Sequence, residues 1–109
     1  MGEELDSGSN GRVNWKKNVD YELIVDGTGE LGNIALPSDV EVLTINEGIT
    51  SIADSCFNSH DNLKEVYIPN TVKTIRDAAF CFCKNLEKVI MKDGVESIGM
   101  NAFTFCPKL

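Results

Sequence analysis

Residues 41–109 read EVLTINEGITSIADSCFNSHDNL (41–63), KEVYIPNTVKTIRDAAFCFCKNL (64–86) and EKVIMKDGVESIGMNAFTFCPKL (87–109), three consecutive blocks of 23 residues. We call these blocks the first, second and third repeats. Six columns of the alignment stay apolar in every repeat. They contain Leu43, Val66 and Val89; Ile45, Ile68 and Met91; Ile49, Val72 and Val95; Ile52, Ile75 and Ile98; Phe57, Phe80 and Phe103; and Leu63, Leu86 and Leu109. So strict a period predicts a solenoid, in which each repeat is one coil that buries its apolar side chains against the next.

The order of residues within the second repeat predicts the path of one coil. Apolar and polar residues alternate over 65–68, which is typical of a half-buried strand. Pro69 ends this strand because proline cannot donate a hydrogen bond to a sheet. A second extended stretch is expected over 72–75, followed by a compact turn or single helical turn from Asp77 that directs residues 79–80 into the core. Adjacent coils should then align their strands about 4.8 Å apart in a short parallel sheet.

The repeats also resemble a known family. The motif residues are Val66, Ile68, Pro69, Val72, Ile75, Ala79, Phe80, Cys83 and Leu86 in the second repeat, and Val89, Val95, Ile98, Gly99, Ala102, Phe103, Cys106 and Leu109 in the third. At this spacing they resemble the BspA-like leucine-rich repeat, and the first repeat departs from it at Cys56 and His60. The resemblance implies a right-handed leucine-rich-repeat solenoid of bacterial and some protist surfaces, which binds host proteins or other cells.

The segment before the repeats has a different pattern. Apolar residues alternate with polar ones at Val13 and Trp15 and again over 21–25, which predicts two antiparallel strands. We therefore expect residues 12–40 to form an N-terminal β-hairpin cap that shields the first coil, with Trp15 covering the end of the core. The polar residues 1–11, rich in Gly and Ser, are expected to be a disordered tail.

Three glycines in this segment match a nucleotide-binding spacing. Gly27, Gly29 and Gly32 are spaced G-x-G-x-x-G, but the dinucleotide-binding loop places this motif between a strand and a helix. Here no amphipathic helix is predicted to follow, and Pro37 comes too soon for one. We interpret the glycines as turn residues and predict no cofactor.

Composition excludes several other functions. Hydrophobic residues make up 42% of the chain and charged residues 25%, which is typical of a folded soluble protein. The formal net charge of −7 repels phosphate backbones, so we expect no nucleic-acid partner. No apolar run approaches the roughly 20 residues of a membrane helix, so we expect no membrane insertion.

The cysteines could indicate a metal site or a disulfide. Cys83 and Cys106 share a column with His60, and ligands spread along such a column span about 10 Å, too far to converge on one zinc ion. We predict no metal site and small buried thiols. A Cys83–Cys106 disulfide is the alternative, although in-register side chains point parallel rather than toward each other. Cys56 is expected in the core and Cys81 on the surface.

No set of residues indicates catalysis. His60 would need a nucleophile or carboxylate partner, and the nearby Asp54 and Asp61 lie in turns where acidic residues are ordinary. Two further sets are also interpreted as structural. A hydroxyl column, expected to satisfy backbone groups, contains Ser51, Thr74 and Ser97. The carboxylates expected to be solvated are Asp39, Glu41 and Glu47. We therefore predict no catalytic residues and no enzyme activity.

The third repeat is expected to expose its core. No polar capping segment follows Leu109, so the coil should present a bare apolar face and a free sheet edge. The array is then either a piece of a longer one or a chain that pairs through this end. In both cases we expect self-association, for example as a homodimer through the open C-terminal coil.

The outward strand positions form the candidate binding face. One row contains Val42, Glu65 and Lys88, and the next contains Thr44, Tyr67 and Ile90. An exposed aromatic side chain beside an apolar one is typical of protein recognition. We predict that a partner contacts Thr44, Glu65, Tyr67, Lys88 and Ile90. The alternative is that these side chains merely cover neighbouring strands.

The predicted function is a non-catalytic protein-binding or adhesion module of a cell-surface or secreted leucine-rich-repeat protein. Its partner would be a protein of a host or a neighbouring cell. We expect an extracellular or cell-surface location. The N-terminal residues lack the layout of a signal peptide, so a cytoplasmic location is the alternative, but it is less favoured. The alternative function is a structural spacer or self-assembling repeat fragment with no partner site of its own.

Overall fold

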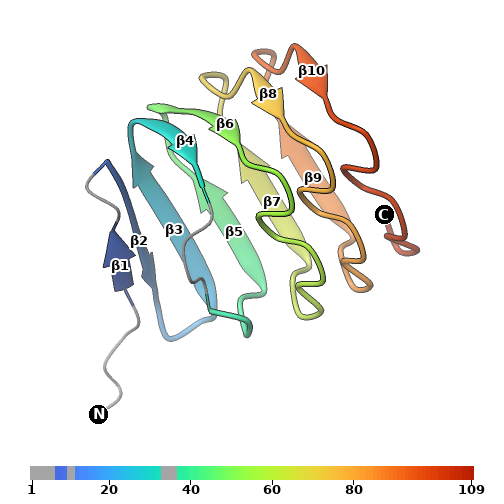
Figure 1. Cartoon of the computed structure of the whole chain (residues 1–109). Helices are drawn as coiled ribbons and strands as arrows, with labels where there is room; N and C mark the ends of the chain where they lie inside the picture. Colours follow the sequence, from blue (N-terminus) through green and yellow to red (C-terminus); the bar gives the residue numbers. More distant parts are fainter. Residues whose placement is uncertain (1–6, 10–11, 33–36) are drawn as a thin grey trace.

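The computed structural model describes residues 7–9, 12–32 and 37–109, and these residues form ten strands and no helix. The strands build two sheets, joined by turns into a flattened coil that repeats along one axis (Figure 1). The larger sheet has the order β1-β2-β3-β5-β7-β9 and the smaller one β10-β8-β6-β4. The strands are β1 (Ser7–Ser9), β2 (Val13–Lys17), β3 (Glu22–Gly27), β4 (Gly29–Leu31), β5 (Val42–Ile45), β6 (Ile49–Ile52), β7 (Glu65–Ile68), β8 (Thr74–Ile75), β9 (Lys88–Met91) and β10 (Ser97–Ile98).

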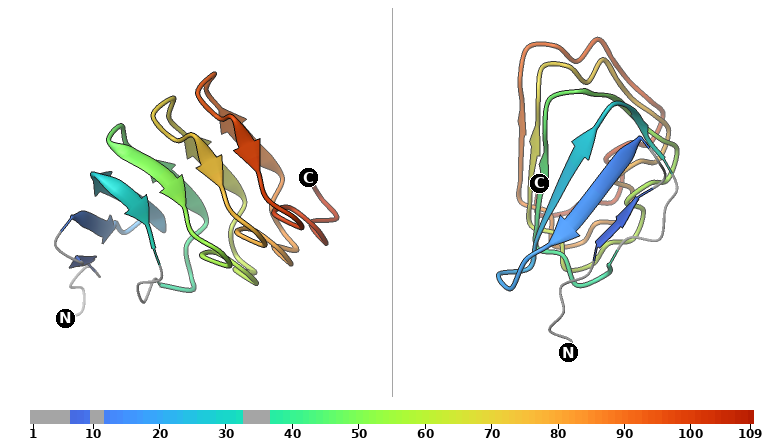
Figure 2. Two further views of the ribbon diagram at one scale, coloured as in Figure 1. Left: turned by 45° about the horizontal axis from the view of Figure 1, so that its top comes forward. Right: turned by 90° about the vertical axis from the view of Figure 1, so that its left-hand side faces the viewer.

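Each repeat supplies one strand to each sheet, and neighbouring repeats pair in parallel. In the smaller sheet Ile75 pairs with Ile52 on one side and with Ile98 on the other, so the predicted column is one straight row. The strand before Pro69 ends at Ile68, as predicted. The view along the axis shows the coils nested one behind another (Figure 2, right). The predicted solenoid of stacked coils is confirmed.

The third side of each coil is a series of turns rather than a helix. These turns lie at residues 54–59, 77–82 and 100–105, and we call the surface that they form the turn side. Backbone hydrogen bonds cross from coil to coil here as they do in the sheets. The Phe57 N–H donates to the Ala79 carbonyl at 2.7 Å, and the Phe80 N–H donates to the Ala102 carbonyl at 2.8 Å.

A continuous row of aromatic rings fills the core beneath the turn side. Phe57 stacks on Phe80 and Phe80 on Phe103, each pair 5.3 Å apart between ring centroids and nearly parallel. Phe57 and Phe80 are fully buried, and burial of a phenylalanine contributes about 2–3 kcal/mol each. The aliphatic columns pack beside these rings in one core.

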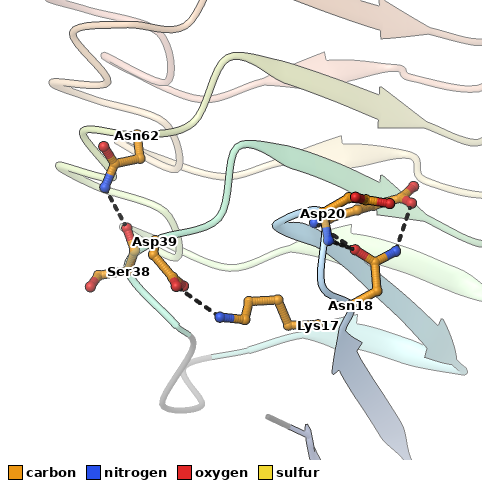
Figure 3. A network of polar contacts seen from close by, with 7 residues as sticks. Lys17, Asn18, Asp20, Ser38, Asp39 and Asn62 are labelled. Atoms are coloured by element: carbon orange, nitrogen blue, oxygen red, sulfur yellow. Dashed lines mark hydrogen bonds and ion pairs between the residues drawn. The ribbon is translucent and has the colours of Figure 1, made fainter. Parts of the chain in front are cut away.

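The N-terminal hairpin forms as predicted from β2 and β3, which pair antiparallel, and Trp15 is buried. Tyr21 does not continue the strand alternation, because it lies in the hairpin turn with a φ of 62° and is exposed. The turn is held by the Asn18 side chain, whose oxygen accepts from the backbone N–H groups of Asp20 and Glu22 (Figure 3).

The coiled architecture starts within the segment that the sequence assigns to the cap. Strand β3 also pairs in parallel with β5, and β4 pairs in parallel with β6. Residues 7–9 form β1, which pairs with β2, where the sequence predicts part of a disordered tail. The rest of that predicted tail lies outside the described residues.

The closely spaced glycines of this segment lie where the chain turns from β3 into β4. Gly27 has a φ of 121°, and a Cβ there would overlap the Arg12 carbonyl. Strand β4 follows directly after Thr28, in the place where a nucleotide-binding loop has its helix. The turn interpretation is therefore confirmed for Gly27 and Gly29, which flank the corner at Thr28 between β3 and β4.

An ion pair within this segment corrects a prediction, and a hydrogen bond from Asn62 joins the segment to the first repeat. The sequence predicts that Asp39 is solvated, but Asp39 forms an ion pair of 2.8 Å with Lys17, whose side chain is largely covered (Figure 3). The Asn62 side chain donates to the Ser38 carbonyl at 3.2 Å. Glu41, also expected to be solvated, lies 3.9 Å from the ammonium group of Lys64, and Glu47 is exposed.

Candidate interaction faces

The outward surface of the larger sheet brings the five predicted binding residues together. Thr44 on β5 pairs with Tyr67 on β7, which pairs with Ile90 on β9. Glu65 pairs with Lys88 in the adjacent row. We call the surface formed by Thr44, Glu65, Tyr67, Lys88 and Ile90 the strand face. Its side chains are exposed or half-buried, whereas the alternate positions of β5 and β7 are buried.

Tyr67 is held at the centre of the strand face by its neighbours. Its hydroxyl donates to a carboxylate oxygen of Glu65 at 2.7 Å, and the Lys88 ammonium group lies 5.9 Å from its ring centroid. The hydrogen bond to Glu65 is the main reason why the pKa of Tyr67 is raised, since losing the proton would break it. These two contacts orient the ring, and Tyr67 stays half-buried.

The strand face extends further toward the N-terminus than the sequence predicts. Glu22 and Ile24 on β3 pair with Val42 and Thr44, and the Thr44 hydroxyl donates to the Glu22 carboxylate at 2.8 Å. The alternation over 22–25 is consistent with this placement, although it predicts only a hairpin strand.

A shallow hollow of about 380 Å³ adjoins the strand face where the strands end. Its lining includes Tyr67 and Ile90 from the strand face. The other lining residues are Ile45, Asn46, Glu47, Ile68, Pro69 and Lys92. The floor is therefore apolar and carries one acidic and one basic side chain. Such a hollow can accept an apolar side chain of a partner between two charged groups.

The turn side carries a second exposed apolar feature, which the sequence pattern does not predict. Cys81 is predicted to be on the surface but is only 5% exposed, because the following residue turns outward in its place. That residue, Phe82, stacks on Phe105 with 4.6 Å between ring centroids. Phe82 and Phe105 have positive φ angles, of 62° and 59°. The sequence does not predict them, because neither residue is glycine.

The remaining thiols contact backbone carbonyls across neighbouring coils. The Cys83 thiol donates to the Phe57 carbonyl at 3.2 Å, and Cys106 donates to the Phe80 carbonyl at 3.1 Å. All four cysteines are free, so the alternative of a Cys83–Cys106 disulfide is not what the structure shows. Burial raises the pKa of Cys83 to about 12, which keeps this thiol protonated and unreactive at neutral pH. Cys56 is buried as predicted, and burial raises its pKa to about 12 as well.

The other predicted polar sites have structural partners. His60 is half-buried and contacts the Phe57 ring edge-on at 5.2 Å. The hydroxyl column differs from the prediction because its members bond side chains rather than backbone groups. Ser51 donates to Glu30 at 2.8 Å, and Ser97 lies 3.5 Å from the Thr74 hydroxyl. In the described part of the chain, no three His, Cys, Asp or Glu side chains cluster as metal ligands would.

These stacked coils, with one strand in each sheet and one apolar residue in each column, define a leucine-rich-repeat solenoid. The chain belongs to the BspA type leucine rich repeat family, whose six-copy model matches residues 29–109. The match includes β4, which agrees with a coil that begins before residue 41.

Two solved structures are similar to this chain. A leucine-rich repeat protein from Eubacterium ventriosum is 25% identical with a TM-score of 0.78, over 86% of this chain and 28% of that one. The Treponema (T. pallidum) leucine rich repeat protein is 19% identical with a TM-score of 0.67, over 95% and 48%, and shows the fold alone. The chain thus spans between about a quarter and a half of these proteins. Comparison with curated proteins gave no significant match.

Over residues 7–9, 12–32 and 37–109 the structure has no helix with the length and apolar character needed to cross a bilayer.

Proposed function

We propose that this chain is a non-catalytic protein-binding module of a cell-surface or secreted protein, and that it binds through the strand face. The observation that carries the proposal is the fixed Tyr67 ring beside the exposed Ile90. Large aromatic residues of this kind dominate the binding energy of protein interfaces. Membership of the BspA type family, which is generally non-catalytic, supports a binding rather than an enzymatic role.

The strand face has the composition of a protein-binding surface. An apolar centre of Tyr67 and Ile90 is bordered by Glu65 and Lys88, and a partner could desolvate the centre while the border stays hydrated. The adjoining hollow offers a place for one partner side chain. An extracellular or surface location with a host or neighbouring-cell protein as the partner remains the proposal.

A structural spacer is the competing function. The continuous phenylalanine row from Phe57 to Phe103 favours it, because stacked columns make a stiff rod. Self-association through the third repeat stays a prediction, which sedimentation at increasing concentration would measure. Ile98 and Leu109 are exposed on that repeat and would be the contacts.

The proposal is tested by removing the apolar centre of the strand face. The chain is assembled on fluorescent streptavidin, and its binding to the surfaces of epithelial and bacterial cells is measured before and after trypsin treatment. The double variant Tyr67→Ser/Ile90→Ser should lose at least about tenfold in trypsin-sensitive binding, because two interface anchors are removed.

The matched control is Val19→Ser, an exposed apolar residue in the hairpin turn that lies outside the strand face. It should bind like the unaltered chain. Equal trypsin-sensitive binding by the double variant would move the site elsewhere. Failure of the unaltered chain to bind any trypsin-sensitive surface would favour the spacer.

A further inference from the structure

The exposed rings of Phe82 and Phe105 are not required by the turns that carry them. Phe82 is 49% exposed and Phe105 is 64% exposed, so neither ring contributes a fully buried surface. Ser59 occupies the same position one coil earlier, with the same φ of 62°. Its N–H donates to the Cys81 carbonyl at 2.8 Å, as the Phe82 N–H does to Thr104 at 2.9 Å. A small polar residue therefore makes the same turn, and a bulky one is unfavourable at a left-handed φ.

The change from serine to phenylalanine along this column leaves one face of an aromatic ring open. Phe82 packs one face of its ring on Phe105, at an interplanar angle of 8°. The opposite face is directed at the coil of Ser59, about one strand spacing away, and the serine side chain is too short to cover it. Since neighbouring coils are spaced by about 4.8 Å, one further ring could stack there.

Polar groups of both charges line a shallow, open hollow that also contains the Phe82 ring. Asp61 and Lys84 lie 3.9 Å apart, and more than half of each side chain is exposed. The Ser59 hydroxyl donates to the Asn58 side chain at 2.7 Å and keeps its acceptor lone pairs. Together with Phe82, these groups line a hollow of about 740 Å³, a volume typical of small-molecule sites. The remaining lining residues are Phe103, Phe105, Cys106 and Pro107.

We propose that this hollow binds a neutral carbohydrate, whose pyranose ring stacks its C–H face on Phe82 and whose hydroxyl groups bond Ser59, Asp61 and Lys84. A sugar ring has one flat apolar face and has hydrogen-bond donors and acceptors around its edge, so it matches the open ring and both charges. An apolar peptide side chain would instead desolvate Asp61 and Lys84 without replacing their bonds to water.

Charge determines which carbohydrates fit. The opposite charges of Asp61 and Lys84 cancel at the rim, so the site has no excess positive charge for an acidic sugar. The net charge of −7 on the whole chain further disfavours sialylated or sulfated glycans. This site is on the turn side and is independent of the strand face and its proposed function.

A printed array of neutral oligosaccharides, each beside its sialylated form, tests the proposal with the chain assembled on streptavidin. The unaltered chain should retain at least one neutral oligosaccharide and bind its sialylated form less. Phe82→Ser removes the aromatic ring on which the sugar is proposed to stack. Ser59→Phe keeps every aromatic residue but covers the open face with a third ring. Both variants should bind about tenfold less, since the sugar can no longer stack on the face of Phe82.

Two comparisons make the result decisive. Tyr67→Ser alters only the strand face and should keep the carbohydrate signal. Ser59→Phe should still fold, because Phe82 and Phe105 adopt the same backbone conformation in the neighbouring coils, and a thermal unfolding curve checks this. The proposal is overturned if no neutral oligosaccharide is retained, if acidic forms are preferred, or if both variants bind as the unaltered chain does. It is also overturned if a proline-rich peptide array binds at Phe82 in place of the oligosaccharides.

Discussion

The second and third repeats have the same apolar columns but differ in burial. Ile75 is 0% exposed, whereas its neighbour in the row, Ile98, is 49% exposed. Phe80 is fully buried and Phe103 only partly. The second repeat contacts a coil on each side, and in the described part of the chain the third contacts a coil on one side. Burial in this fold is therefore a property of the stack and not of the residue.

The strands show the same difference. Strand β7 alternates between half-buried and buried residues, as a strand over a core should. Strand β9 pairs with it residue for residue, yet none of its side chains is fully buried. The repeat motif thus identifies which side chains can be buried, and the number of neighbouring coils determines how deeply they are buried. The contribution of a side chain to stability should therefore depend on how many coils its repeat contacts.

Truncating the isoleucine row gives the largest expected effect. Ile75→Ala should lower the free energy of unfolding by about 3 kcal/mol, because it leaves a cavity between two coils. Ile98→Ala removes the same atoms from a half-exposed position and should cost about 1 kcal/mol or less. Urea unfolding followed by circular dichroism measures both values. Equal losses would show that the third repeat is as well packed as the second, and would contradict the difference in burial described above.

A smaller effect is expected where the two repeats differ in one turn residue. The second repeat has Thr71, whose hydroxyl donates to the Ile49 carbonyl at 2.8 Å. The third repeat has Gly94, where a Cβ would overlap the Asn70 carbonyl. Gly94→Ala should therefore cost about 2 kcal/mol, because backbone must shift to admit one methyl group.

The control for this substitution is Gly32→Ala, since a Cβ at Gly32 meets no atom of the described residues within 4 Å. That variant should stay within about 0.5 kcal/mol of the unaltered chain or be slightly more stable. Thermal unfolding of the two variants in parallel separates the steric effect from the general effect of replacing glycine. A neutral Gly94→Ala would mean that the turn of the third repeat can relax.

The sequence predicts the parts of the fold that depend on the period. Columns 23 residues apart place Ile52, Ile75 and Ile98 in one row, and Pro69 marks the end of a strand. The preceding coil has no such period, because Glu22 pairs with Val42 only 20 positions later and β4 has a register shift at Gly29. A search for a fixed spacing therefore misses it and assigns β3 and β4 to a cap.

Of the two candidate sites, one could be predicted from the sequence and the other could not. The strand face follows from alternation, which is a local property, so Tyr67 and Ile90 could be placed from sequence. The turn side depends on left-handed backbone at residues such as Ala78 and Phe82, and non-glycine residues give no sign of it. For that reason the sequence wrongly predicts that Cys81 is exposed and gives no indication that Phe82 is.

The smallest expected effect extends the comparison to the first repeat, where His60 occupies the column of Cys83. His60 is half-buried, and among the described residues its Nε2 atom has no hydrogen-bond partner. Burial lowers the pKa of His60 from 6.5, because the charged imidazolium is poorly solvated there. Cys83 has its pKa raised to about 12 and does not titrate near neutral pH.

The folded chain therefore holds His60 neutral at a pH where the unfolded chain binds a proton. Because the unfolded state then binds more protons, the free energy of unfolding should fall as the pH drops below 6.5. Urea unfolding between about pH 7.5 and about pH 5 should show a shallower decline for His60→Gln than for the unaltered chain. Cys83→Ala should be less stable throughout but keep the original pH dependence. Parallel curves for the unaltered chain and His60→Gln would place the pH sensitivity in the carboxylates instead.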